Sequence, residues 1–278
     1  MSVKISVIIT CYNYGEFIEE TIDSVENQTF KQFEIIVVDD GSTDSHTHDV
    51  LKSLEAKGVT VIRQVNAGPS SARNSGIKVA RGNYIVPLDA DDLIAPTFLE
   101  KCNLVLDSDP EVSVVYTEVE YFGAKTGKMK LEPLSASAMV LNNCIVATAM
   151  YRRSVWETVG GYNEDMKICI EDWDFWIGCL ENGLRFKLIP ESLFFYRIKL
   201  ISRNDAFLQD ETIHFSAYCQ MVNNHPAFFG ENAVSLAKEI QRLRSLERLR
   251  GISVLKKINE FYLPILRFFK RISYRIKY

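Results

Sequence analysis

The sequence lacks the paired cysteines and the long apolar runs that identify several classes of protein. Its 278 residues include six scattered cysteines, and no two of them form a C-x-x-C pair, which argues against zinc and favours reduced thiols. No apolar run reaches the roughly eighteen residues that a membrane-spanning helix needs. The N-terminal residues enter a strand pattern directly, without the features of a signal peptide. We therefore expect a cytoplasmic protein.

Two phosphate-binding motifs are also missing. The dinucleotide fingerprint G-x-G-x-x-G is absent after the first predicted strand, and so is the P-loop G-x-x-x-x-G-K-[ST]. These absences disfavour a nicotinamide-dependent dehydrogenase and a P-loop kinase. The four histidines, His46, His48, His214 and His225, follow no metal-ligand spacing and are interpreted as structural or surface residues.

The formal net charge of −4 conceals an uneven distribution along the chain. From Lys238 to Tyr278 there are twelve Lys and Arg against three Asp and Glu, so this segment carries +9 and the preceding residues carry −13. An acidic body with a basic tail indicates two surfaces with different partners.

Apolar, β-branched runs alternate four times with segments of helical periodicity over the first 95 residues. This alternation predicts an α/β fold, a doubly wound and mostly parallel sheet with helices on both faces. The predicted strands are 3–10, 33–38, 59–63 and 84–88. After residue 95 we expect helices at 97–106, 155–159 and 170–182, strands at 112–116, 146–151, 186–189 and 193–196, and a helical pattern from 206 onward.

The first, second and fourth predicted strands each end in a polar cluster, and these clusters are Thr10 to Asn13, Asp39 to Ser42, and Asp89 to Asp92. Because the carboxyl ends of parallel strands share one edge of a sheet, the three clusters predict a nucleotide-sized crevice. Carboxylates gathered there repel one another unless a cation lies among them, which favours Mg²⁺ or Mn²⁺ with substrate phosphates. The alternative is a solvated acidic turn that caps the next helix.

Several motifs occur in a fixed order along the chain: a strand I-S-V-I-I-T, then T-x-Y-N, V-V-D-D-G-S-T-D, N-x-G-x-x-x-A-R-N, L-D-A-D-D, G-G-Y and E-D-x-D-x-W. This ordered set resembles the family 2 glycosyltransferases of the GT-A fold over about Ser2 to Tyr196. The resemblance implies a nucleotide-sugar glycosyltransferase domain at residues 1–203, with a nucleotide-binding half at 1–95 and an acceptor-binding half at 96–203. A helical C-terminal extension with a basic amphipathic tail would follow at 204–278.

The resemblance also implies roles for residues at the strand ends. Thr10 and Tyr12 would line the base pocket, and Asp40 would accept a hydrogen bond from the base. Arg73 would face the nucleotide or diphosphate, and Asp89 would reach the ribose or the metal.

The expected metal ligand is Asp91, with Asp89 as its companion and Mn²⁺ or Mg²⁺ as the ion. The family often has a histidine soon after the Tyr-Arg that follows the last strand, and this histidine can complete the set of metal ligands. This sequence has Lys199 in about that place. A lysine ammonium is not a metal ligand at neutral pH, although it could contact the diphosphate itself. Metal-assisted transfer is the prediction, and transfer without a metal ion is the alternative.

Asp172 resembles the general base of the family, the carboxylate that takes the proton of the acceptor hydroxyl as its oxygen attacks the anomeric carbon with inversion. Gly161, Glu171 and Trp173 are assigned to the acceptor side. The alternatives are an acidic first turn favoured by the helix dipole for Glu171 and Asp172, and core packing for Trp173.

Residues 250–278 mix aromatic, aliphatic and basic side chains at helical spacing. Such a segment can lie in a membrane interface, with its cations toward anionic headgroups. That placement suits a peripheral enzyme at the inner face of the cell membrane. The alternative is a final helix packed on its own domain or on a second subunit of a homodimer. Nucleic acid is not an expected partner, because the body is acidic.

The leading prediction is an inverting, metal-assisted transfer of a hexosyl or N-acetylhexosaminyl group from a nucleotide-sugar, a UDP-sugar in the first place, to a hydroxyl of a saccharide or lipid-linked saccharide. The alternatives are an inactive saccharide-binding or scaffold subunit and a nucleotidyltransferase. The second of these would need a cationic loop after the first strand, and Tyr12 to Glu16 contains no Lys or Arg.

Overall fold

The structure is a computed structural model that describes residues 3–167, 169–199, 211–234, 237, 238 and 241. The chain divides into two compact units. The first consists of Met1–Leu131 and Ile145–Gln209, and the second of Glu132–Cys144 and Asp210–Tyr278.

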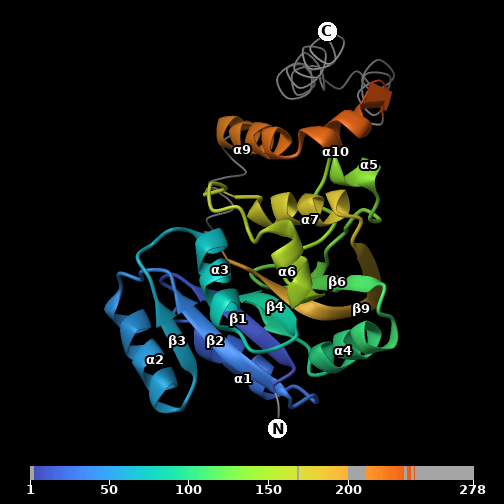
Figure 1. Cartoon of the computed structure of the whole chain (residues 1–278). Helices are drawn as coiled ribbons and strands as arrows, with labels where there is room; N and C mark the ends of the chain where they lie inside the picture. The colour runs from blue at the N-terminus through green and yellow to red at the C-terminus, as the bar shows by residue number, and fades with distance from the viewer. Residues whose placement is uncertain (1–2, 168, 200–210, 235–236, 239–240, 242–278) are drawn as a thin grey trace. The chain divides into compact units, whose positions relative to one another are not determined.

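Four parallel strands open the first unit (Figure 1): β1 (Ile5–Cys11), β2 (Phe33–Asp39), β3 (Thr60–Arg63) and β4 (Tyr84–Asp89). Three helices connect them: α1 (Ile18–Glu26), α2 (Ser45–Ala56) and α3 (Pro69–Val79). In the strand order β3-β2-β1-β4, the chain adds β2 and β3 on one side of β1 and then returns to add β4 on the other side. In open α/β sheets, ligands bind where the order reverses, beside the carboxyl ends of the strands.

The strand β1 is central and is covered on both faces. Ile5, Val7, Ile8 and Ile9 have no exposed surface, as expected when helices cover both faces of a parallel sheet. On one face α3 approaches closely, because Gly76 presents no side chain to the sheet.

The second half of the sheet mixes strand directions. The strand β6 (Val112–Gly123) pairs in parallel with β9 (Arg185–Ile198) and antiparallel with β8 (Met150–Arg152), which also joins β4. Two short strands, β5 (Leu93–Ile94) and β7 (Gly127–Lys128), pair with β9 and β6. The helices of this half are α4 (Phe98–Ser108), α6 (Arg153–Val159) and α7 (Glu171–Glu181). The predicted α/β fold, with a mostly parallel sheet and helices on both sides, is confirmed.

The last strand corrects the sequence-based prediction of two short strands at 186–189 and 193–196. β9 is continuous, because Thr117 pairs with Ile189 while the next residue of β6, Glu118, pairs with Ser192. Pro190 and Glu191 have no partner in β6 and form an irregularity like a β-bulge, although their composition is typical of a turn. The predicted strand at 146–151 is also shorter in the structure, where β8 covers Met150–Arg152.

The regular elements of the second unit, over its described residues, are all helices. They include α5 (Ala136–Met139), α9 (Glu211–Asn224) and α10 (Pro226–Glu231). The Tyr218 hydroxyl donates to the Val140 carbonyl oxygen, and the Tyr218 and Phe229 rings meet edge to face with centroids 5.9 Å apart. Within the described residues, no helix is long and apolar enough to cross a bilayer. The predicted amphipathic tail, residues 250–278, lies outside the described residues.

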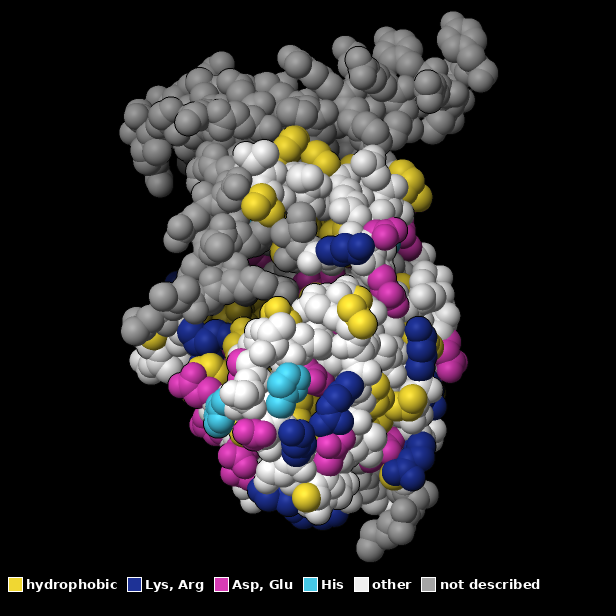
Figure 2. Space-filling model, turned by 90° about the vertical axis from the view of Figure 1, so that its left-hand side faces the viewer, with side chains coloured by type: hydrophobic (Ala, Val, Ile, Leu, Met, Phe, Trp, Pro, Cys, Tyr) yellow, Lys and Arg dark blue, Asp and Glu magenta, His cyan; other side chains and the backbone are white. Residues whose placement is uncertain are grey.

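Charges of both signs are mixed on the molecular face shown in Figure 2, where Lys and Arg side chains lie among Asp and Glu. Surface pairs of the first unit include Arg63 with Glu55 at 2.6 Å and Arg81 with Glu34 at 2.8 Å. The basic excess of residues 238–278 falls almost entirely outside the described residues. The Arg63–Glu55 pair is partly exposed on both sides, and because solvent screens such a pair it contributes little to stability.

Gly76→Ala tests the close contact of α3 with the sheet. An alanine ordinarily stabilises a helix interior by about 1 kcal/mol relative to glycine. Here the added Cβ would lie 2.4 Å from Ile8 Cγ2 and 3.1 Å from Val38 Cγ2, and overpacking costs about 1–3 kcal/mol. We expect a net loss of stability, measured as a lower midpoint of urea unfolding. Lys78→Ala, at an exposed position of the same helix, is the control and should change little. A more stable Gly76→Ala protein would contradict this packing.

Candidate functional site

The carboxyl ends of β1, β2 and β4 lie next to one another (Figure 1). In the sheet register Thr10 pairs with Val38 on one side and with Asp89 on the other. The Thr10 hydroxyl donates to Asp89 Oδ1 at 2.9 Å. The structure thus brings together the polar strand ends that the sequence singled out.

Tyr12 lies in the loop after β1, and 42 % of its surface is exposed. An exposed aromatic ring can stack on a planar ligand. The next residue, Asn13, has a φ of 59°, and its Oδ1 accepts a hydrogen bond from Thr43 N at 2.7 Å. Asn13 therefore joins the loop after β1 to the loop after β2.

Asp40, directly after β2, is 5 % exposed. Its carboxylate accepts hydrogen bonds from Gln64 Nε2 at 2.7 Å and from the backbone N–H groups of Ala67 and Gly68 at 2.9 Å each. The φ of 91° at Gly68 is readily adopted by glycine alone. Asp40 therefore organises the loop that leads into α3, which the sequence did not reveal, and a nucleotide base would meet a carboxylate already fixed by that loop.

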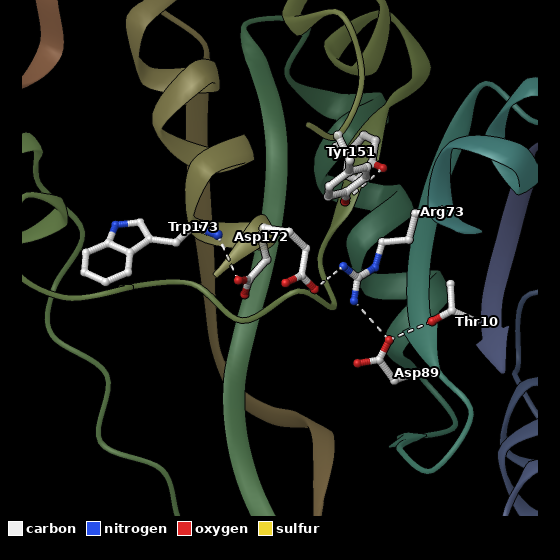
Figure 3. Close-up of polar contacts among 8 residues, drawn as sticks. Thr10, Arg73, Asp89, Tyr151, Asp172 and Trp173 are labelled. Atoms are coloured by element: carbon white, nitrogen blue, oxygen red, sulfur yellow. Dashed lines mark hydrogen bonds and ion pairs between the residues drawn. The ribbon is translucent and has the colours of Figure 1, made fainter. Parts of the chain in front are cut away.

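Arg73, on α3, lies between two carboxylates from distant parts of the chain (Figure 3). Its Nη2 donates to Asp89 Oδ1 at 3.0 Å, at the end of β4. Its Nη1 donates to Glu171 Oε1 at 2.7 Å, at the start of α7. The guanidinium carbon also lies 5.5 Å from the centroid of the Tyr162 ring. One side chain therefore joins the parallel part of the sheet, at the end of β4, to the helix that carries the expected base.

The environment of Arg73 keeps it charged. Its side chain is 2 % exposed, and burial alone would lower the pKa of a guanidinium. The charges of Asp89 and Glu171 outweigh burial and hold the pKa of Arg73 well above its usual value. The resemblance predicted that Arg73 faces the nucleotide or diphosphate. The structure adds a positioning function, because both Nη atoms bind carboxylates of the chain.

Asn74 is a residue whose function the sequence analysis missed. Its Nδ2 donates to the Tyr162 carbonyl oxygen at 2.8 Å and to Glu164 Oε1 at 2.9 Å. Its Oδ1 accepts from Trp156 Nε1 and from Tyr162 N, both at 2.9 Å. Three of these bonds hold the loop between α6 and α7 against α3, and the fourth, from Trp156, joins α6 to α3. The only signal in the sequence was its place in the A-R-N motif.

Gly161, which the sequence assigned to the acceptor side, lies against Asn74. Its φ is 89°, and a Cβ at this position would stand 3.0 Å from Asn74 Oδ1 and 3.1 Å from Trp156 Nε1. A side chain here would therefore be strained and would also crowd Asn74. The second glycine of the G-G-Y motif therefore allows the backbone to pack closely against Asn74 and Trp156.

The helix α7 begins after a residue with an unusual backbone conformation. Ile170 has φ 54° and ψ 21°, a left-handed conformation that costs a β-branched residue about 1–3 kcal/mol. Glu171 and Trp173 are 7 % and 4 % exposed, whereas Asp172 between them is less buried. Asp172 Oδ1 accepts a hydrogen bond from Trp173 N at 2.8 Å (Figure 3). Asp172 thus lies in the first turn, where the helix dipole stabilises its charge, and Trp173 packs in the interior.

Lys199 follows β9 and reaches the expected metal ligand. Its Nζ donates to Asp91 Oδ2 and to the Tyr14 hydroxyl, both at 2.6 Å. The neighbouring Asp92 is 2 % exposed and accepts a hydrogen bond from Arg197 N at 2.9 Å. Burial and the charges of Asp91 and Asp89 raise the pKa of Asp92 well above its ordinary value.

The two carboxylates expected to hold Mn²⁺ or Mg²⁺ are both paired with cations of the chain. Asp89 pairs with Arg73, and Asp91 pairs with Lys199. These ions take oxygen ligands, Mg²⁺ in near-ideal octahedral geometry, and a lysine ammonium supplies none. Over the residues that the structure describes, no group of three or more His, Cys, Asp or Glu is arranged to hold a metal ion. The donor set as arranged therefore does not fit a divalent cation.

Comparison with known proteins identifies the family. The model of a family described as glycosyl transferase family 2 matches residues 6–170. An uncharacterized glycosyltransferase of Methanocaldococcus jannaschii is 30 % identical over 207 residues, which cover 70 % of each chain. Another, from Nostoc sp., is 34 % identical over 215 residues, which cover 70 % of this chain and 65 % of the relative. The chain thus spans about two thirds of the length of these relatives.

Solved structures share the fold. TarS 1-349 of S. aureus in complex with UDP aligns with a TM-score of 0.65 at 21 % identity, covering 92 % of this chain and 74 % of that one. The mannosyltransferase PcManGT from Pyrobaculum calidifontis, in complex with GDP-Man and Mn²⁺, aligns with a TM-score of 0.59 at 19 % identity, covering 99 % and 86 %. The chain belongs to glycosyl transferase family 2 and is a glycosyltransferase with the GT-A fold.

Proposed function

We propose that the protein transfers a sugar from a nucleotide-sugar to a hydroxyl of a saccharide or lipid-linked saccharide, with inversion and with Asp172 as the general base. The main observation in support of this proposal is that Arg73 forms ion pairs with both Asp89 and Glu171. It fixes the first turn of α7, and therefore Asp172, beside the strand end at which a donor would bind.

The donor site of this proposal is the edge formed by β1, β2 and β4. The exposed ring of Tyr12 would stack on the base, and Thr10 and Asp40 would contact the nucleoside. Asp89 would reach the ribose. UDP is the first candidate nucleotide, because TarS of S. aureus, which shares the fold, has been solved with UDP and with UDP-GlcNAc. A hexosyl or an N-acetylhexosaminyl group would be the moiety transferred.

The chemical step needs one carboxylate on the acceptor side. The proton of the acceptor hydroxyl passes to Asp172 as the oxygen forms a bond to the anomeric carbon. The bond from that carbon to the diphosphate breaks, and its electron pair leaves with the phosphate oxygen. Glu171 forms an ion pair with Arg73 and serves to position the turn. Gly161 and Trp173 shape the acceptor side through packing.

The proposal assigns no step to Mn²⁺ or Mg²⁺. The sequence favoured such an ion at Asp91 and Asp89, and PcManGT, which shares the fold, was solved with Mn²⁺. In this chain both carboxylates are paired with Arg73 and Lys199. The negative charge of the diphosphate must then be balanced by side chains.

In this enzyme, residues 1–95 would bind the nucleotide and residues 96–203 would bind the acceptor. Residues 204–278 would form a C-terminal extension. The extension would hold the enzyme at the inner face of the cell membrane, near a lipid-linked acceptor. Packing of the same extension on a second copy of the chain is the competing proposal. The sequence offers the same apolar and basic side chains for both.

Asp172→Asn tests the base. The amide cannot take the acceptor proton, so we expect the turnover number to fall about 10²–10⁴-fold while the dissociation constant of the nucleotide-sugar stays unchanged. The measurements are product formation from radiolabelled donor and calorimetric titration with the same donor. Glu181→Gln, an exposed carboxylate at the other end of α7, is the control and should retain activity. Near-normal turnover of Asp172→Asn would place the base elsewhere. An inactive saccharide-binding subunit would instead show donor binding without turnover in the wild type.

Deletion of residues 251–278 tests the membrane contact. If the segment lies on the membrane, the shortened protein should stay folded and hydrolyse donor slowly, but it should lose binding to anionic vesicles. Vesicle binding by the full chain should also weaken with added salt, because screening acts beyond about 10 Å at 0.1 M. Co-sedimentation with vesicles and circular dichroism provide the readouts. An unfolded or insoluble deletion variant, with no vesicle binding by the full chain, would show instead that the segment packs on protein.

A further inference from the structure

The contact between Lys199 and Asp91 is a largely buried ion pair. The Lys199 and Asp91 side chains are 17 % and 13 % exposed, and Nζ lies 2.6 Å from Asp91 Oδ2. Nζ also lies 2.6 Å from the Tyr14 hydroxyl and 3.9 Å from the centroid of the Tyr14 ring. A surface lysine samples many rotamers, whereas this one has its ammonium fixed by a carboxylate, a hydroxyl and an aromatic face.

The backbone that carries Lys199 is tied to the same acidic turn. Two residues earlier, Arg197 donates its backbone N–H to Asp92 Oδ1 at 2.9 Å and its Nε to the Asp91 carbonyl oxygen at 2.7 Å. Its guanidinium carbon lies 4.7 Å from the centroid of the Phe17 ring and 4.3 Å from that of Phe122. The end of β9 is therefore held against the turn after β4, and the position of the Lys199 ammonium follows from that contact.

The ammonium remains charged in this position. Burial would favour the neutral amine, but a carboxylate and a hydroxyl in hydrogen-bond contact stabilise the ammonium. The ammonium has three N–H donors, and Asp91 and Tyr14 take two of them. The third has no acceptor among the residues that the structure describes, and it can donate to an oxygen of a ligand at the strand ends.

We propose that Lys199 is a built-in cation that takes the place of a divalent metal ion, so that this enzyme binds the diphosphate of its donor without metal. The inference rests on the proposed function and names the cationic group that donates a hydrogen bond to the diphosphate. Asp91 then has a different function from the one expected from the sequence: it orients the ammonium, and it does not ligate a metal. A divalent cation at Asp91 would have to displace the ammonium that is paired with this carboxylate, and among the described residues no group of three or more His, Cys, Asp or Glu is arranged to hold such an ion.

Binding of UDP and GDP to the full-length protein tests the proposal. Calorimetric titrations are run after exhaustive treatment with EDTA and again with millimolar Mn²⁺. We expect the wild type to bind one of the two nucleotides in EDTA, with a dissociation constant that Mn²⁺ changes less than about threefold. This comparison requires no variant and is therefore independent of any folding defect.

Lys199→Gln provides the second arm. In EDTA its affinity for the nucleoside diphosphate should fall about ten- to hundredfold, as a hydrogen bond to a charged group is lost. Its affinity for the corresponding nucleoside, measured by NMR, should stay within about twofold, because the nucleoside has no phosphate. A purely structural defect would weaken both. Lys128→Gln, which removes an exposed lysine paired with Glu118 at 2.9 Å, is the matched control and should bind as the wild type does.

Three outcomes would overturn the proposal in different ways. Wild-type protein that binds UDP or GDP only with Mn²⁺ would refute the built-in cation and leave the proposed glycosyl transfer intact. Unchanged diphosphate binding by Lys199→Gln, or an equal loss for diphosphate and nucleoside, would refute the contact between Lys199 and the diphosphate. Absence of binding to both nucleotides, with and without Mn²⁺, would refute the proposed donor class and this inference with it.

Discussion

A buried guanidinium holds the candidate site together. Arg73 is 2 % exposed, and a charge in such a place is tolerated only when it is paired. Asp89 and Glu171 pair with it from the end of β4 and from the start of α7. Glu171 is 9 % exposed, so its pair with Arg73 is buried, and removal of one partner from such a pair costs about 3–5 kcal/mol, a large part of the total stability of a protein. The strand end, α3 and the first turn of α7 are therefore fixed relative to one another, and the place of Asp172 depends on this.

The sequence predicted well the features that depend on neighbouring residues along the chain. The run from Ile5 to Cys11 is apolar and β-branched because both faces of β1 are covered, and a short polar cluster marks its end. Strand direction follows from the alternation with helices, so the meeting of Thr10 and Asp89 could be expected before any coordinates. The resemblance supplied the family, which the comparisons confirm.

The features that the sequence did not predict are contacts between residues far apart in the chain. The residues around Asp91 do not reveal that Lys199 pairs with it. The resemblance placed Lys199 only near the expected metal site, and the contact itself depends on the long ladder between β6 and β9. The ladder was itself underestimated, since Pro190 and Glu191 resemble a turn and only the pairing of Ile189 and Ser192 with neighbouring residues of β6 shows that β9 continues. Local composition cannot distinguish a bulge from a turn when the partner strand is unknown.

The four hydrogen bonds of Asn74 have a consequence for isosteric replacement. An amide has two donor hydrogens and two acceptor lone pairs on its oxygen, and here every one of them is used. Aspartate has the same shape, but its carboxylate would face the carbonyl oxygen of Tyr162 and the carboxylate of Glu164, two acceptors, with no hydrogen to give either of them. Leucine also fills a similar volume and would leave all four partners unsatisfied. The requirement at this position is thus set by the pattern of donors and acceptors, and neither size nor polarity alone can meet it.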